Sequence, residues 1–371
     1  MQNTASLPVD QYEVLLRRLP PNLDLDALAR ETQAIERGGK IGSGRTLLRL
    51  ALARGPGGLS LSQTAAWASM LGLADMSDPA VKYRLDKAVG FLDAVMHCQL
   101  AAQAPGAAVR WAGRSLQNAD GSCFRERGSK TTSWRLHAVY DLGSGGFSHL
   151  ELTDKHGAEA INRGTPIPGE IRLGDRNFAR AANLHRFRQQ SANQADFIVR
   201  VGWSAFSLTR PDGTDFDLIA HLATLPVDLA PHEMRVRARL PPRSAAHGGD
   251  FLPLRMIIRR KTQEATEATR KELFREASRK QKTLDLRSLV AAEFVILATS
   301  LPLAGYPAEE VLAVYRLRWQ IELAFKRLKS LLHMDRIPTR TELASRSWLT
   351  THLIFALLCD DLSQQMLESS P

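Results

Sequence analysis

Cysteine is scarce in this chain of 371 residues, and long apolar runs are missing from it. The three cysteines, Cys98, Cys123 and Cys359, are far apart and show no CxxC spacing, which argues against a disulfide framework or a zinc site. The first residues have no basic segment followed by an apolar one, so no signal peptide is expected. The longest apolar stretches, such as 294–297, are too short to cross a bilayer. These absences predict a protein that works in the reducing cytoplasm.

Positive charge is what the chain has in excess. It carries 49 Lys and Arg against 39 Asp and Glu, a formal net charge of +10. A surplus of this size favours a polyanionic partner, with nucleic acid as the first candidate, although a merely basic surface would give the same number. Apolar residues make up 44% of the chain, so a packed core is expected. The length allows one large domain or two to three ordinary ones.

Residues 1–108 have the spacing and punctuation of helices. Ser60 is a typical N-cap, Gly72 a typical stop, and Ser77 with Pro79 begins a further helix. A helix, a short turn with glycine and a second helix form the outline of a helix-turn-helix, so this region is predicted to be a helical DNA-binding domain. Any helical bundle would give the same pattern.

The period changes after the small-residue segment 101–112, which is typical of a linker. Residues 109–203 predict a mixed α/β core, because three strand-like stretches precede an alternation of helix and strand. The expected strands are 114–118, 133–140, 147–152, a stretch ending at Asp175, and 197–201, with helices at 158–162 and 179–188. Turns are predicted at Asp120-Gly121 and at 143–146.

Residues 204–292 interrupt that rhythm and predict a β-rich insertion. Short alternating stretches at 235–240 and 254–258 precede a charged helical run at 262–282. The adjacent cations Arg259, Arg260 and Lys261 are expected on a solvated face, as most charge runs are. The α/β pattern resumes over 293–371, with a buried strand at 293–299, a long helix from Pro307 to about residue 334, and an apolar helix at 350–362.

One polar stripe on the long helix carries chemistry. Tyr315, Arg318, Glu322 and Lys329 stand at offsets 0, 3, 7 and 14, which places them on one helical face at about 100° per residue. A separate face holds apolar residues at 317, 321, 328 and 331. The alternative is an ordinary ion pair between Arg318 and Glu322, four residues apart on a solvated surface.

Two aspartates complete a candidate metal site. Asp120 is expected at the end of the first strand and Asp175 at the end of a later one, where α/β sheets place their ligands. Each could instead be a turn former. Together with Glu322 they would supply the hard oxygen ligands that Mg²⁺ prefers, and two such ions about 3.5–4 Å apart can activate an attacking oxygen and stabilise a leaving one.

The spacing Tyr315-x2-Arg318-x3-Glu322-x6-Lys329 resembles the Tyr–Arg–Glu–Lys signature of DDE transposases from bacterial insertion sequences, of the insertion-sequence-four type. Asp120-Gly121-Ser122 is similar to the first-Asp motif of that family, and Asp175-Arg176 to its second. The family places a β-rich insertion between its last two acids, within an RNase H-like core. The resemblance covers roughly residues 24–365. Relatives commonly carry a further C-terminal stretch used for pairing, so a shortened copy is one expectation.

The resemblance implies a role for each matching residue. Asp120, Asp175 and Glu322 would be the catalytic residues and would hold two Mg²⁺ or Mn²⁺ ions. Tyr315, Arg318 and Lys329, with Lys326 nearby, would bind DNA phosphates, and Phe294 could stack on a flipped base. The partners would be the double-stranded inverted-repeat ends and a target DNA, bound by a homodimer at the nucleoid. Two alternatives are a metal-dependent nuclease without strand transfer and a non-catalytic DNA-binding copy that inhibits transposition.

Overall fold

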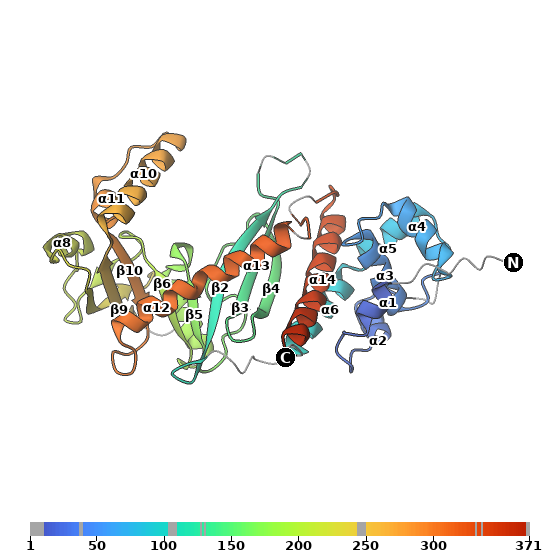
Figure 1. Cartoon of the computed structure of the whole chain (residues 1–371), viewed down its shortest axis with the longest axis horizontal. Coiled ribbons are helices and arrows are strands. Elements are labelled where there is room, and N and C mark those ends of the chain that lie inside the picture. The colour runs from blue at the N-terminus through green and yellow to red at the C-terminus, as the bar shows by residue number, and fades with distance from the viewer. Residues whose placement is uncertain are drawn as a thin grey trace.

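A computed structural model describes residues 11–368 apart from 37–39, 103–109, 127, 130, 243–249, 331 and 335–336, with side chains to residue 359. A long mixed sheet forms its middle, and helices from both ends of the chain pack together at one end of it (Figure 1). The helices before the sheet are α1 (Gln11–Leu16), α2 (Leu25–Glu31), α3 (Gly44–Arg54), α4 (Leu61–Met70), α5 (Asp78–Lys87) and α6 (Val89–Ala102). The Ser60 cap is confirmed as a full capping box with Gln63. Most of the expected linker lies outside the described residues.

The ten-stranded sheet has the order β4-β3-β2-β5-β6-β10-β9-β8-β7, with β1 paired to β2. Its strands are β1 (Arg110–Trp111), β2 (Arg114–Phe124), β3 (Trp134–Asp141), β4 (Gly146–Asp154), β5 (Ile171–Gly174), β6 (Asp196–Arg200), β7 (Leu208–Thr209), β8 (Pro231–Arg239), β9 (Phe251–Arg260) and β10 (Phe294–Thr299). The first three long strands are antiparallel, whereas β5 and β6 run parallel to β2. The three strands of residues 204–292 continue the same sheet beyond β10.

The prediction of a turn at Asp120-Gly121 is wrong. Strand β2 continues to Phe124, and Asp120 lies in its middle, opposite Ala138 of β3. The ladder with β3 holds this segment extended, which overrides the local turn preference of Asp-Gly. Gly121 serves a different need, because a Cβ atom there would lie 2.7 Å from the Oε1 atom of Glu159.

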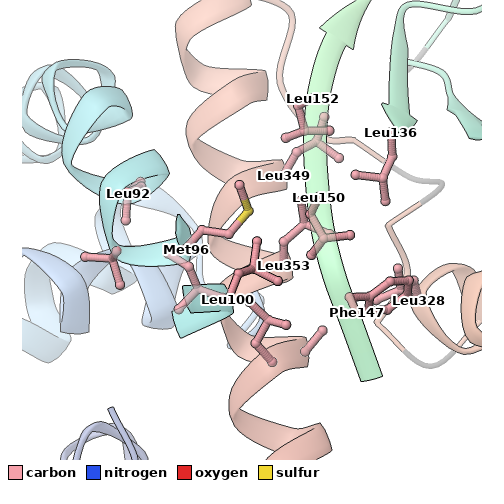
Figure 2. Packing of buried hydrophobic residues seen from close by; sticks show 14 of the residues in the cluster. Leu92, Met96, Leu100, Leu136, Phe147, Leu150, Leu152, Leu328, Leu349 and Leu353 are labelled. Carbon is pink, nitrogen blue, oxygen red and sulfur yellow. The ribbon is translucent and has the colours of Figure 1, made fainter. Parts of the chain in front are cut away.

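Two hydrophobic clusters cover the two faces of the sheet. Along β6, Ile198 belongs to one cluster, whereas Phe197 and Val199 belong to the other, as strand alternation requires. The larger cluster reaches from the sheet into α6 and α14 (Glu342–Glu368), where Met96 of α6 and Leu353 of α14 pack toward β4 (Figure 2). The helices of residues 11–102 therefore share a continuous core with the sheet.

No helix forms at 158–162, contrary to the sequence prediction. The segment is a loop, and its backbone carbonyls are satisfied by a buried arginine instead of by helical hydrogen bonds. Arg172 of β5 donates to the carbonyl oxygens of Ile161, Arg163 and Gly164 and pairs with Glu170 at 2.8 Å. These hydrogen bonds attach the loop to β5.

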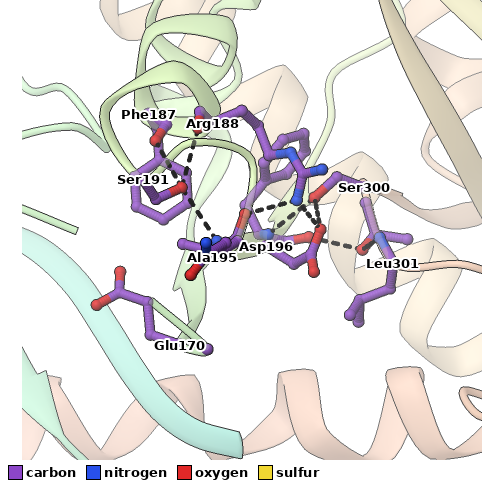
Figure 3. A network of polar contacts seen from close by, with 12 residues as sticks. Glu170, Phe187, Arg188, Ser191, Ala195, Asp196, Ser300 and Leu301 are labelled. Atoms are coloured by element: carbon purple, nitrogen blue, oxygen red, sulfur yellow. Dashed lines mark hydrogen bonds and ion pairs between the residues drawn. The ribbon is translucent and has the colours of Figure 1, made fainter. Parts of the chain in front are cut away.

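A polar network holds the start of β6 in place (Figure 3). It lies beside the first residue of β5, at the other end of that strand from Asp175. The Asp196 carboxylate accepts from Arg188, from Arg114 at 2.6 Å and from Ser300 at 2.6 Å. Arg188 lies on α7 (Ala181–Gln190), close to the predicted helix 179–188. The network ties β2, which carries Asp120, to β6 and to the end of β10.

The expected long helix from Pro307 is interrupted. It consists of α12 (Ala308–Tyr315), the 3-10 turn η2 (Arg316–Arg318) and α13 (Trp319–Ser330). Asn118 of β2 donates to the carbonyl oxygen of Leu317 within the turn, which holds it against the sheet. The remaining helices are α8 (Leu218–Thr224), α10 (Gln263–Arg279), α11 (Leu286–Ala291) and α14, which extends the predicted 350–362 in both directions. Within the described ranges no helix is long and apolar enough to cross a membrane.

Candidate active site

Asp120 faces a hollow between β2 and α13. Its carboxyl group is mostly buried, and burial raises its pKa to about 6 from 3.8. The Gly121 amide, which donates to Oδ1 at 2.7 Å, opposes this shift, while the negative charges of Asp175 and Glu159 add to it. Asp120 is therefore a carboxylate that lacks solvent and would be stabilised by a nearby cation.

Asp175 follows β5, as predicted, and caps the 3-10 turn η1 (Arg176–Phe178). Its Oδ1 atom accepts from the Asn177 amide at 2.8 Å. The side chain lines a cleft together with Arg200, Tyr315 and Arg318. Asp175 thus shares a cleft with the arginine that approaches Asp120.

Arg318 connects the acids. Its guanidinium lies 2.6 Å from Glu322 Oε1 and 3.8 Å from Asp120 Oδ2. The ion pair considered as the simple alternative is therefore present, but Arg318 is turned toward the sheet and is 21% exposed, whereas Glu322 is 56% exposed. A merely solvated i,i+4 pair would not also touch a buried carboxylate on a strand.

The other stripe residues divide between two sides of this arginine. The Tyr315 hydroxyl donates to the Gly174 carbonyl at 3.3 Å, and burial raises the pKa of Tyr315 to about 12. Lys326 and Lys329 line the hollow that contains Asp120 and Glu322. Tyr315 therefore lies beside Arg318 in the cleft of Asp175, whereas the two lysines lie on the side of Asp120.

Sequence reasoning missed Glu159, which approaches Gly121 from the loop that Arg172 fastens. An acidic residue in a loop belongs to no recognisable sequence pattern. The helix predicted at 158–162 also gave no reason to place Glu159 near Gly121. Phe294 is the reverse case. It is 3% exposed and covered by Arg260 at 4.5 Å from its ring, so the expected base-stacking role is wrong.

Comparison with known proteins assigns the family. Residues 110–358 match the family model described as the transposase DDE domain. This chain belongs to that family. The putative transposase InsL for insertion sequence element IS186A of Escherichia coli (strain K12) is 35% identical to this DDE-family chain over 362 residues, covering 98% of it and 96% of the relative.

One further relative and one solved structure extend the comparison. The transposase for insertion sequence element IS421 of Escherichia coli is also 35% identical, over 363 residues, with the same coverage of 98% and 96%. Among solved structures, a cryo-EM structure of the piggyBac transposase synaptic complex with hairpin DNA aligns with a TM-score of 0.40 and 10% identity, over 95% of this chain and 65% of that one.

The acids of this DDE-family chain suit a divalent cation in their chemistry. All are hard oxygen ligands, and the buried Asp120 carboxylate lies near two further negative charges. Among the residues that the structure describes, no three His, Cys, Asp or Glu side chains are close enough to enclose one ion. Glu322 is instead paired with Arg318, and its exposed side chain lines the hollow that also contains Asp120.

Replacing Asp120 with Asn should stabilise the metal-free protein at neutral pH. A raised folded pKa means that the carboxyl group favours folding below pH 3.8 and that this contribution is lost as the pH rises through about 6. The ionised form then costs up to about 3 kcal/mol, at 1.36 kcal/mol per unit. Thermal unfolding at pH 7.5 would show a higher Tm for Asp120→Asn without metal.

The metal response supplies the control for that variant. Mn²⁺ should raise the Tm of the wild-type protein at pH 7.5 and much less at pH 5, where Asp120 is protonated. Asp120→Asn should lose the response at both pH values. A variant that is less stable than the wild type at pH 7.5 would contradict a desolvated carboxylate.

Proposed function

We propose that this chain is a DNA transposase of the insertion-sequence-four type, which cleaves transposon ends and joins them to target DNA. Asp120, Asp175 and Glu322 are its catalytic acids and bind two Mg²⁺ or Mn²⁺ ions. The observation that supports this most is the position of Arg318, which brings the helix acid and a buried strand acid against one guanidinium. The near full-length likeness to named insertion-sequence transposases supports the reaction.

Each group has a distinct task in this proposal. The bound ions would activate the attacking oxygen and stabilise the leaving one. With Glu322 holding an ion, Arg318 would be able to donate two parallel hydrogen bonds to the oxygens of a phosphate. Lys326 and Lys329 hold neighbouring phosphates in the hollow beside Asp120.

The surrounding architecture is part of the proposal. Strands β2 to β6 form an RNase H-like core, because three antiparallel strands precede two parallel ones and the acids lie on β2 and after β5. Residues 204–292 are an insertion into it, and residues 1–108 bind DNA. Lys82 and Lys87 of the candidate helix-turn-helix are already paired with Asp86 and Glu36, which leaves Arg84 as its more available cation. We further propose a homodimer on DNA in the cytoplasm, at the nucleoid.

Cleavage of the element's own end tests the reaction. Terminal inverted repeats should flank the reading frame, and a duplex carrying one repeat should be cut at its boundary with Mg²⁺ or Mn²⁺ and not with EDTA. Joining of the cut end to a plasmid separates a transposase from a nuclease, which would release the end without joining it. Binding without cleavage in either metal would indicate a non-catalytic copy.

Lys329→Ala should weaken binding of the repeat duplex and reduce the slope of log affinity against log salt by about one, the value for one phosphate contact. Arg318→Ala should do the same, whereas an ordinary surface ion pair would cost a few tenths of a kcal/mol of stability and leave DNA affinity alone. Lys282, exposed beyond the end of α10, provides the matched control Lys282→Ala. If the variants have the same affinity and the same salt slope as the Lys282→Ala control, Lys329 and Arg318 do not contact the DNA.

A further inference from the structure

A second cationic groove lies on the other side of Arg318 from Lys326 and Lys329. It runs from the end of β6 across the start of β10 and the end of β9 to the turn η2. Its lining includes the cations Arg200, Arg259, Arg260, Lys261 and Arg316, with Glu309 as the carboxylate at one margin. None of these five is required by the catalytic proposal.

The cations at the inner end of this groove form no ion pair with a described residue, and Asp175 is the acid whose charge acts on Arg200. Lys261 is half-buried, and burial followed by the charges of Arg200 and Arg176 lowers its pKa to about 8. Burial and then Arg176 lower the pKa of Arg200 as well. Within the described part of the chain neither Arg200 nor Arg176 forms an ion pair, and Arg316 is exposed without one. Like charges held together in this way favour the binding of an anion.

The acids at the outer end of the groove are paired with cations. Arg259 pairs with Glu309 at 3.0 Å, and Arg260 pairs with Glu293, which also binds Arg270. Lys261 is held in place by neutral hydrogen-bond acceptors and not by a carboxylate. Its ammonium donates to the Thr269 hydroxyl at 2.9 Å and to the Ala292 carbonyl at 2.8 Å, which leaves one of its three donors for a ligand.

The groove is continuous with the candidate active site. Arg318 and Tyr315 line both the groove and the cleft of Asp175, where Arg200 is also present. Cations therefore extend from the acids in two directions, toward Lys326 and Lys329 on one side and toward Lys261 on the other. A DNA strand whose reacting phosphate lies at the acids continues away from them on both sides, toward its 5′ end and toward its 3′ end.

We propose that the groove of Arg200, Lys261 and Arg316 binds the phosphodiester backbone of the DNA beyond the scissile bond, while Lys326 and Lys329 bind the transposon end. This inference rests on the proposed function. It identifies the flanking DNA as a ligand in its own right, recognised by charge and without base contacts. The pinned ammonium of Lys261 and the free guanidinium of Arg316 each supply one phosphate contact.

Two duplexes separate the groove from the rest of the DNA contact. Both carry the terminal repeat of the element, one ending at the scissile bond and one continuing for about 10 base pairs, one helical turn, of flanking DNA. Lys261→Gln and Arg316→Gln should each weaken the longer duplex severalfold and lower its log–log salt slope by about one. Both should bind the shorter duplex as the wild type does, which also verifies that they are folded.

Lys282→Gln is the charge-matched control and should leave both duplexes unaffected. If the wild type gains no affinity from the flank, or if the variants weaken both duplexes equally, the groove does not bind flanking DNA. Failure of the wild type to prefer the repeat or to cut it would instead overturn the proposed function. Arg316 makes no ion pair with a described residue, so its variant keeps the test open if Lys261→Gln fails to fold.

Discussion

Replacing Glu322 with Gln should lower the rate of cleavage at the transposon end by about 1,000-fold or more. The amide keeps the shape of the side chain and can still accept a hydrogen bond from Arg318, but it lacks the charge that holds a divalent cation. A metal that stabilises both reacting oxygens contributes several kcal/mol to the transition state, and each 1.36 kcal/mol is a factor of ten. Single-turnover cleavage with Mg²⁺ measures the loss.

DNA binding distinguishes this effect from misfolding. The variant removes no cation, so the affinity of the repeat duplex and its salt slope should stay close to the wild-type values. Glu342→Gln, an exposed glutamate in the first turn of α14, is the matched control and should cleave normally. Cleavage by Glu322→Gln at the wild-type rate would remove this residue from the metal site.

Replacing Arg172 with Met should destabilise the fold by about 3–5 kcal/mol, the range for breaking a buried ion pair from one side. Arg172 is 2% exposed, and its loss leaves Glu170, at 0%, without its cation. Burial already raises the pKa of Glu170 against the attraction of Arg172. The carbonyl groups of the loop at 161–164 would also lose their donor. Urea denaturation followed by circular dichroism gives the change in the free energy of unfolding.

A double variant isolates the cost of the unpaired charge. Arg172→Met with Glu170→Gln removes both charges and should recover a large part of the lost stability, since no unpaired charge is left buried. The remaining deficit reflects the unsatisfied carbonyls. A single variant that loses less than about 1 kcal/mol would show that the pair contributes little, as surface pairs do.

The sequence predicts those parts of the candidate site that rest on local patterns. Asp175 follows a short buried strand and precedes a turn, and both features are visible in the residues around it. Glu322 and Lys329 fall on one helix, which periodicity reports well. The strands 133–140 and 197–201 are confirmed within a residue or two as β3 and β6.

The parts that depend on distant contacts could not be predicted. Asp120 is extended because β3 pairs with it, and nothing in Asp120-Gly121 itself specifies that partner. The break at η2 is stabilised by the hydrogen bond from Asn118 to Leu317, two residues that are 199 positions apart in the chain. The groove was not predicted, because a run of cations such as Arg259, Arg260 and Lys261 is typical of a solvated face. Only the fold shows that Lys261 is half-buried between Arg200 and α10.

The packing of α6 against α14 sets an order of events during synthesis. Met96 of α6 and Leu353 of α14 belong to the same buried cluster, although about 240 residues of chain separate the two helices. At about 5–20 residues per second, the ribosome needs roughly 10–50 s to produce that interval. During this time the part of α6 that packs against α14 has no permanent cover. Completion of the nascent fold therefore waits for the last helix, and the early helices must remain free of aggregation until it emerges.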